Sequence, residues 1–336
     1  MRALAANLPR SLEEGFRAGR ELAPPVKSGA TMVVGVGMGG SGIAADLARG
    51  VVESESSVAL SIARAPDLPR SVGPTSHVVL VSYSGNTWET LRAYSAAARA
   101  GARRTVISSG GLLTEKARAD GVPVLAVPPG LPPRSAVGHL LGGLLGLLDP
   151  AFPESNEARI ARVAERTRAL IVTYARPRGP AAGLAERIGP RLPFIYAENP
   201  FLALARRWKT QIEENAKRLA IFDEVPELLH NALVGWDATP RAEAGRYAVA
   251  LLEWSEESPP VRKSFRYLER LLGARGARVL RVPLEAEDRL EALLAGVALG
   301  DHVSLFLADR RKVDPLPVEA IGRLKAAIGN PANVAR

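Results

Sequence analysis

The alternation of short apolar runs with helical stretches most constrains the fold of this chain. TMVVGVGMGGSGIAADLARGVV predicts a strand, a glycine-rich turn and a helix, and HVVLVSYSGNTWETLRAYSAAARAGARRTVISSG repeats that order. Strands that alternate with helices of about 10–15 residues are typical of a parallel sheet covered by helices on both faces. The sequence therefore predicts an α/β fold.

The same alternation restarts after a polar segment at 149–157 and a charged helix at 155–174. A chain of 336 residues is long enough for two domains of ordinary size. We expect an N-terminal domain, a helical linker and a C-terminal domain at 1–152, 153–184 and 185–336, respectively. The strands expected in the C-terminal domain lie at 191–198, 246–254, 277–284 and 302–309, with a helix at 285–298 before the last of them.

Composition excludes several classes of function. The chain has no cysteine, which rules out disulfides, thiolate catalysis and zinc–thiolate sites. Its net charge is +9, but the basic residues are scattered and only 17 residues are aromatic, so we expect no nucleic-acid partner. No apolar run approaches the ~18–20 residues of a membrane span, and the N-terminus does not resemble a signal peptide, so we expect a cytoplasmic protein.

Two loops rich in small residues, GVGMGGSG at 35–42 and SYSGNT at 82–87, each follow a strand. Main-chain N–H groups at helix N-termini attract anions, and glycine lets the backbone approach a ligand closely. The first loop also contains G-x-G-x-x-G, which can bind a dinucleotide when an acidic residue closes the next strand. Here only Asp67 is available, beyond Arg64 and Pro66, so a phosphate ligand is favoured and no cofactor is expected.

Five segments in the order GVGMGGSG, SYSGNT, PPRSA, QIEENAK and PELLHN resemble the archaeal-type bifunctional phosphoglucose/phosphomannose isomerases over nearly the whole chain. The resemblance implies two SIS-type domains, each a mainly parallel sheet flanked by helices. It also implies an aldose–ketose isomerase that acts on a hexose 6-phosphate without metal or cofactor. The phosphate-binding residues would be Gly39, Gly40, Ser41, Ser82, Ser84 and Thr87.

Isomerisation between C1 and C2 of a sugar needs a base, and QIEENAK offers Glu213 and Glu214. Adjacent helix residues point about 100° apart, so the two carboxylates cannot easily share one site. The resemblance implies that Glu214 is the base, whereas we expect Glu213 to be a solvated helix residue. A helix glutamate paired with Lys217 or Arg218 is the alternative for Glu214.

The resemblance assigns three further residues. His230 would act in ring opening, and because this histidine crosses into the partner's site in the family, we expect a homodimer. Arg134 would stabilise an enediolate oxygen. Lys325 would assist ring opening, although Lys312 lies close enough in sequence to leave this assignment open.

Two positions depart from the family pattern. Trp88 stands where relatives often carry an acidic residue, and Leu316 replaces a threonine thought to accommodate both epimers at C2. Activity on mannose 6-phosphate is therefore less secure than activity on glucose 6-phosphate. Two alternatives remain: a SIS-fold sugar-phosphate sensor without turnover, and a SIS isomerase that acts on an amino sugar phosphate or a pentose phosphate.

Overall fold

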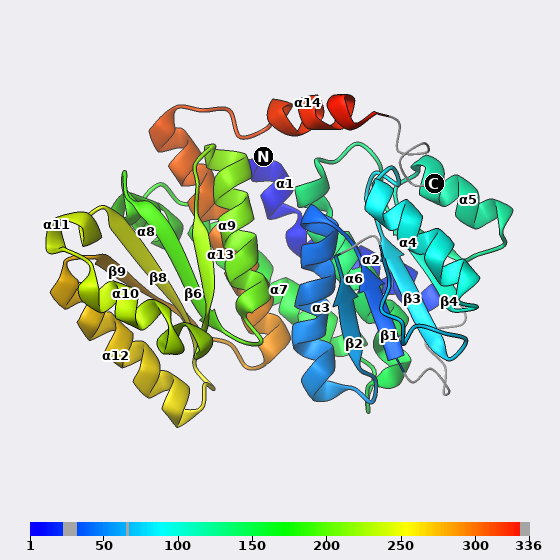
Figure 1. Ribbon diagram of the computed structural model, residues 1–336, viewed down its shortest axis with the longest axis horizontal. Coiled ribbons are helices and arrows are strands. Elements are labelled where there is room, and N and C mark those ends of the chain that lie inside the picture. The colour runs from blue at the N-terminus through cyan, green and yellow to red at the C-terminus, as the bar shows by residue number, and fades with distance from the viewer. Residues whose placement is uncertain (23–31, 65–66, 330–336) are drawn as a thin grey trace. The chain divides into compact units, whose positions relative to one another are not determined.

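The computed structural model describes residues 1–22, 32–64 and 67–329, apart from the side chains of residues 325 and 328. The chain forms two compact units (Figure 1). The N-terminal unit comprises Asn7–Glu165 and Val318–Arg336, and the C-terminal unit comprises Met1–Ala6 and Arg166–Pro317. The boundary between them falls within helix α7 (Glu157–Tyr174).

The N-terminal unit contains a five-stranded sheet in the order β2-β1-β3-β4-β5. All four strand pairs are parallel, and Val34 of β1 pairs with Val78 of β3. The carboxyl ends of the strands therefore lie at one edge of the sheet. Besides the first part of α7, the elements of this unit are α2 (Leu8–Glu21), β1 (Met32–Val36), α3 (Gly39–Glu55), β2 (Leu60–Ala63), β3 (Ser76–Val81), α4 (Trp88–Arg99), β4 (Arg103–Ser108), α5 (Gly111–Ala119), β5 (Val124–Ala126), η1 (Pro133–Ala136), α6 (Val137–Leu148), η2 (Asp149–Ala151) and α14 (Glu319–Ile328).

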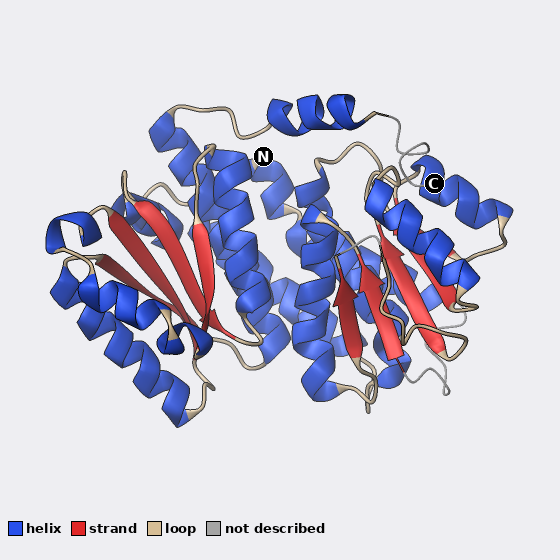
Figure 2. Ribbon diagram, viewed as in Figure 1, coloured by secondary structure: helices blue, strands red, loops and turns tan. Residues whose placement is uncertain are grey.

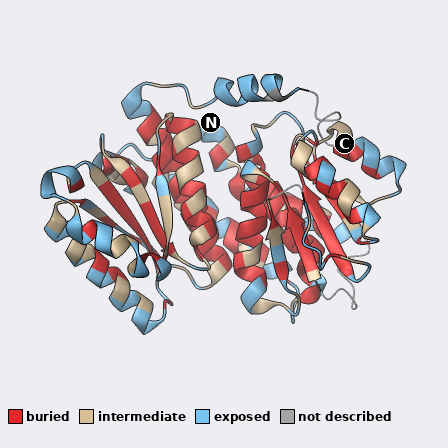
Figure 3. Cartoon of the chain, viewed as in Figure 1, coloured by how far each residue is buried: buried red, intermediate tan, exposed pale blue. Residues whose placement is uncertain are grey.

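Helices cover both faces of this sheet (Figure 2). On one face, Leu80 and Val106 pack with Leu91 of α4 in one buried cluster. Successive strand residues face opposite sides, and the next residue along β4, Ile107, faces α6. A Cβ built on Gly143 of α6 would lie 3.7 Å from the Ile107 side chain. The central strand β3 is consequently buried from both sides (Figure 3).

The apolar helix α6 is buried over its whole length. Its glycines at every fourth position lie against α2. A Cβ at Gly138 would lie 2.7 Å from the Cβ of Ser11 and 2.8 Å from the carbonyl oxygen of Leu8. Glycine therefore allows a closer approach of the two backbones than any larger residue would.

The C-terminal unit contains a four-stranded sheet in the order β7-β6-β8-β9, again with every pair parallel. On one face, Val249 and Leu251 of β8 pack with Phe265 and Leu268 of α12. The two parallel sheets flanked by helices confirm the predicted fold class. Besides the rest of α7, the elements of this unit are α1 (Arg2–Ala6), α8 (Pro180–Ile188), β6 (Leu192–Glu198), α9 (Leu202–Ala216), β7 (Ile221–Val225), η3 (Glu227–His230), α10 (Ala232–Ala238), α11 (Arg241–Ala244), β8 (Tyr247–Trp254), α12 (Pro259–Arg275), β9 (Arg278–Leu284) and α13 (Arg289–Arg311).

The helix expected at 285–298 is present from Arg289 but continues to Arg311, so the strand expected at 302–309 is wrong. Its polar residues in the middle find partners inside the unit: Asp301 pairs with Arg207, and His302 Nδ1 is hydrogen-bonded to the Ala298 carbonyl at 2.8 Å. By length and composition this helix could cross a membrane, but 94% of its most apolar window is buried. We therefore assign it to the core of the C-terminal unit.

The sequence analysis also missed strand β7 (Ile221–Val225). This strand lies at the edge of the C-terminal sheet, and its sequence IFDEV begins with an exposed isoleucine and has two acidic residues after the phenylalanine. Such an edge strand lacks the apolar run that identifies a central one. The other three expected strands are confirmed as β6, β8 and β9.

Candidate active site

Two loops of small residues lie where the strand order of the N-terminal sheet reverses. The strand order places β2 outside β1 on one side and β4 and β5 outside β3 on the other, so β1 and β3 flank the switch point. Open parallel sheets bind ligands outside the carboxyl ends of their strands at such a point. The loop before α3 follows β1, and the loop at 82–87 follows β3. Both therefore lie at the edge where a ligand is expected.

A hydrogen bond joins the two loops. The main-chain N–H of Tyr83 donates to Ser41 Oγ at 3.2 Å, and both residues are buried. Within the second loop, Ser82 Oγ donates to Thr87 Oγ1 at 3.1 Å. Because Ser41 and Thr87 act as acceptors in these bonds, each keeps a hydroxyl hydrogen that can donate to another group. This arrangement suits an oxyanion with several acceptor oxygens.

Left-handed glycines shape both loops. Gly39 has φ +52°, and no described atom lies within 4 Å of a Cβ built there, so its backbone opens toward free space. Gly85 has φ +65°, and a Cβ there would overlap the main-chain carbonyl of Gly110. Ser84 Oγ accepts the N–H of Asn86 at 3.3 Å, which closes the turn. The first glycine thus leaves room for a ligand, and the second packs the loop against its neighbour.

Arg134 is brought to the first loop. Arg134 lies in the short helix η1 and is only 2% exposed. A Cβ at Gly40 would lie 3.1 Å from the Pro133 carbonyl oxygen and 3.3 Å from the Arg134 Cα. Glycine at position 40 therefore allows the main chain at 133–134 to lie directly against the first turn of α3.

Tyr83 holds the segment that leads to Arg134, a role that the sequence analysis missed. Its hydroxyl donates to the Pro128 carbonyl at 3.0 Å and accepts the N–H of Leu131 at 2.6 Å. These partners are 45 and 48 residues away along the chain. No local sequence pattern could indicate them.

The end of β2 argues against a dinucleotide in the first loop. Arg64 follows this strand, where a ribose-binding acid would be needed, and its guanidinium forms an ion pair with the buried Asp46 of α3. Among the described residues, no group of three or more His, Asp or Glu side chains could hold a metal ion.

Glu214 lies in the last turn of α9, in the C-terminal unit, and is half-buried. Its neighbour Glu213 forms an ion pair with Lys209 at 2.7 Å, one turn earlier. The two carboxylates therefore have separate surroundings, as their angular separation on the helix requires.

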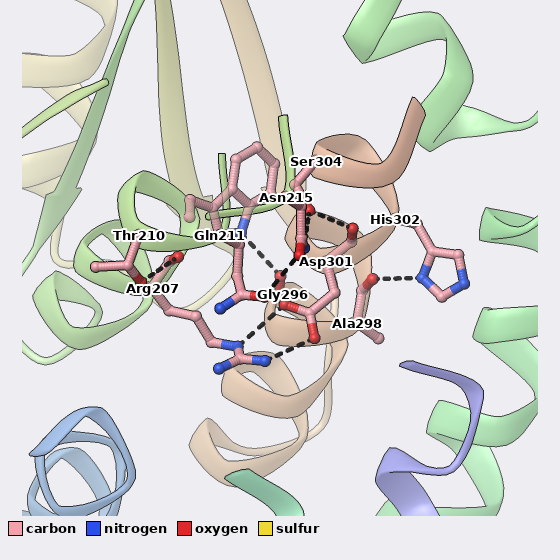
Figure 4. A network of polar contacts seen from close by, with 10 residues as sticks. Arg207, Thr210, Gln211, Asn215, Gly296, Ala298, Asp301, His302 and Ser304 are labelled. Atoms are coloured by element: carbon pink, nitrogen blue, oxygen red, sulfur yellow. Dashed lines mark hydrogen bonds and ion pairs between the residues drawn. The ribbon is translucent and has the colours of Figure 1, made fainter. Parts of the chain in front are cut away.

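A buried polar network fixes α9 against α13 next to Glu214 (Figure 4). Arg207 makes two hydrogen bonds with Asp301, at 3.1 and 2.7 Å. At the second-last position of α9, the Asn215 amide donates to Gln211 Oε1 at 3.2 Å and to Ser304 Oγ at 2.9 Å. Buried polar networks with satisfied partners rigidify their surroundings. The residue that follows Glu214 is consequently held in a packed interface between two helices.

The remaining predicted residues lie at different places. His230 is exposed at the end of η3 in the C-terminal unit. Leu316 is 47% exposed, and its N–H donates to Asp314 Oδ1 at 2.8 Å. Trp88 is half-buried at the first position of α4. Lys325 belongs to α14, but its side chain lies outside the described residues.

Residues 178–328 match the bacterial phospho-glucose isomerase C-terminal SIS domain. The C-terminal domain of glucosamine-fructose-6-phosphate aminotransferase from Francisella tularensis has the same fold. Its TM-score is 0.72 at 15% identity, with 93% of this chain and 96% of that chain covered.

Two curated sequences are similar over most of their length. The bifunctional phosphoglucose/phosphomannose isomerase of Aquifex aeolicus is 32% identical, with 87% of this chain and 89% of the relative covered. The enzyme of the same name from Caldicellulosiruptor bescii is 32% identical, with 95% of this chain and 96% of the relative covered. This chain therefore belongs to the bifunctional phosphoglucose/phosphomannose isomerase family.

Proposed function

We propose that this protein interconverts glucose 6-phosphate and mannose 6-phosphate with fructose 6-phosphate. The observation that carries the proposal is the family relationship over 95% of the chain. The hydrogen-bonded pair of small-residue loops at the sheet's switch point supports it, because such loops suit a sugar phosphate.

In this proposal the N-terminal unit binds the phosphate. The main-chain N–H groups at the start of α3 and the hydroxyls of the second loop donate to its oxygens. Glycine at the first loop lets the backbone approach without a side chain in the way. Arg134, held next to that loop, places a guanidinium where negative charge develops on an enediolate oxygen.

Two of the proposed acid–base residues, Glu214 and His230, belong to the C-terminal unit, and the third, Lys325, lies on α14. His230, with Lys325, opens the ring: the bond between C1 and the ring oxygen breaks, the ring oxygen gains a proton and the C1 hydroxyl loses one. Glu214 then removes the proton from C2 of the aldose, and the electron pair forms the C1–C2 double bond of a cis-enediol while the C1 carbonyl oxygen gains a proton. Glu214 then delivers the proton that it took from C2 to C1, and the C2 hydroxyl loses its proton, which gives the ketose. The sugar is neither oxidised nor reduced overall.

The test is a coupled assay without added metal that follows fructose 6-phosphate formation from glucose 6-phosphate and, separately, from mannose 6-phosphate. Glu214→Gln should lower kcat by roughly a thousandfold or more while sugar-phosphate binding persists. Glu213→Gln is the matched control, since Glu213 pairs with Lys209. Unchanged turnover in Glu214→Gln would refute the assignment of the base.

The same assay separates the alternatives. If glucose 6-phosphate alone reacts, Leu316 is the first candidate for the narrowed specificity, because it occupies the position of the family threonine. Binding of either hexose phosphate without turnover would favour a sensor. Turnover of only an amino sugar phosphate or a pentose phosphate would favour another SIS isomerase.

We also propose a homodimer in which His230 reaches the partner's site. Large apolar side chains close to it in sequence are exposed: Leu219 is 74%, Ile221 41% and Val234 73% exposed. The edge strand β7 lies in the same stretch. Exposed apolar residues beside an unpaired strand edge are a common feature of protein–protein interfaces.

Mixing two inactive variants tests this arrangement. When Glu214→Gln and His230→Ala protomers are unfolded and refolded together, a mixed dimer regains one intact site if His230 serves the partner. Random pairing then restores about a quarter of wild-type activity. If His230 serves its own subunit, no activity returns.

The substrates of the proposed reaction are charged metabolites, so we place the protein in the cytoplasm.

A further inference from the structure

Lys217 ends helix α9 in a backbone conformation that lysine rarely adopts. It is the C-cap residue, with φ 53° and ψ 43°, in the left-handed region. Glycine occupies this region without a steric penalty, whereas a residue with a Cβ does not. The presence of lysine at a position that favours glycine suggests that its side chain has a task.

The Lys217 ammonium binds main-chain carbonyls from two distant segments. It donates to the carbonyl oxygen of Glu214 at 2.5 Å and to that of Pro317 at 2.7 Å, with Pro315 at 3.4 Å. The partners at 315 and 317 are 98 and 100 residues away. A cation at the C-terminus of a helix is also favoured by the helix dipole. One side chain thus ties the last turn of α9 to the segment that follows α13.

Arg311 reinforces the same junction from α13. Its guanidinium donates to the Ala216 carbonyl at 3.1 Å and to the Lys217 carbonyl at 2.5 Å. The final carbonyl groups of α9 are therefore bound by two cationic side chains. Glu214, in this turn, has its own carbonyl fixed by one of them.

We propose that Lys217 is a positioning residue for the base Glu214. It acts through the main chain: by binding the Glu214 carbonyl and the carbonyls at 315 and 317, it fixes the direction in which the carboxylate leaves the helix. This inference rests on the proposed function of Glu214 as the base. In this proposal Lys217 does not contact the substrate.

Two substitutions separate positioning from folding. Lys217→Met removes the ammonium and keeps the left-handed strain, whereas Lys217→Gly removes both. Lys263→Met, at an exposed position of α12, is the control for the loss of one positive charge. We expect kcat to fall by about tenfold or more in both Lys217 variants, with KM within about threefold of wild type. Lys217→Arg, which can still donate to carbonyls, should recover part of kcat.

The measurements are steady-state kinetics per folded molecule, the thermal midpoint, and hydrogen–deuterium exchange of peptides that cover 212–219 and 313–317. Lys217→Gly should keep a thermal midpoint close to that of wild type while exchange in both peptides becomes faster. A kcat within about twofold of wild type in both Lys217 variants would overturn the proposal. So would exchange in Lys217→Met that matches Lys263→Met. A wild-type protein without turnover would refute the proposed function instead, and the exchange comparison would still decide whether Lys217 holds the junction.

Discussion

Replacing Glu257 with glutamine should stabilise the protein increasingly as the pH rises. Glu257 follows β8 and is only 4% exposed, and its Oε1 accepts the N–H of Trp254 at 2.8 Å. Burial, opposed in part by that hydrogen bond and reinforced by the carboxylates of Glu198 and Glu253, raises the pKa of Glu257 from 4.5 to about 7. Glutamine can accept the same hydrogen bond but carries no charge.

The magnitude follows from proton linkage. The folded protein holds this proton more tightly than the unfolded chain, so ionisation of Glu257 favours unfolding. The loss of unfolding free energy is absent below pH 4.5, increases between pH 4.5 and about 7, and is constant above that range. Each pKa unit corresponds to roughly 1.4 kcal/mol, so the wild-type protein loses roughly 3 kcal/mol at about pH 8 relative to the Gln variant.

Urea unfolding followed by far-UV circular dichroism, at about pH 5 and about pH 8, measures the difference. Glu256→Gln is the matched control, because Glu256 is exposed in the same loop. We expect the Glu257→Gln variant to gain more free energy of unfolding at the higher pH and the control to gain little at either. An equal gain at both pH values would show that packing, not ionisation, is responsible. No gain would refute the reasoning about burial.

Three other substitutions test the site and its support. Ser41→Ala leaves the buried N–H of Tyr83 without its acceptor, so urea unfolding should show a loss of about 1–3 kcal/mol, with a higher KM for the sugar phosphate. Gly85→Ala forces a Cβ into the neighbouring backbone, and the loss in the same assay should exceed the roughly 1–2 kcal/mol of left-handed strain alone. Asp301→Ala leaves Arg207 without this carboxylate and should cost roughly 3–5 kcal/mol, whereas an apolar pair at both positions should restore most of it.

The sequence predicts strands with a continuous apolar run better than strands with little apolar character or buried helices that contain polar residues. Apolar strands between turn residues identify β1, β3, β6 and β8, because these strands are buried in the middle of their sheets. The run HVSLFLAD reads equally well as a strand, since an apolar run of this length does not distinguish a buried strand from a buried helix. The polar residues Asp301 and His302 interrupt the apolar pattern of the helix, and tertiary structure supplies their partners, Arg207 and the Ala298 carbonyl.

For the site, the sequence predicts which loops and motifs matter but not how they are joined. The bond between Tyr83 and Ser41 spans 42 residues, and the contact between Gly40 and Arg134 depends on tertiary folding. Lys217 belongs to a motif quoted for the resemblance, yet its three carbonyl partners become visible only in the structure. The local sequence indicates which chemical groups a residue offers, whereas the tertiary structure determines which atoms those groups contact.

The strands β2-β1-β3-β4 and β7-β6-β8-β9 follow the same order, but the two sheets differ in what they can bind. In the N-terminal sheet the switch point carries glycines and hydroxyls, whereas the corresponding strands of the C-terminal sheet, β6 and β8, end in or lead to Glu198, Glu253 and Glu257. Carboxylate oxygens accept hydrogen bonds and offer a phosphate no donors, in contrast to glycine N–H groups and hydroxyls. A second phosphate site at that edge is therefore disfavoured. The proposed base Glu214 lies at the other end of α9, roughly 18 Å along the helix from its start near that edge. Glu214 thus lies away from the edge that a sheet of this topology ordinarily uses for binding, and this difference between the units is consistent with one phosphate site for each proposed base.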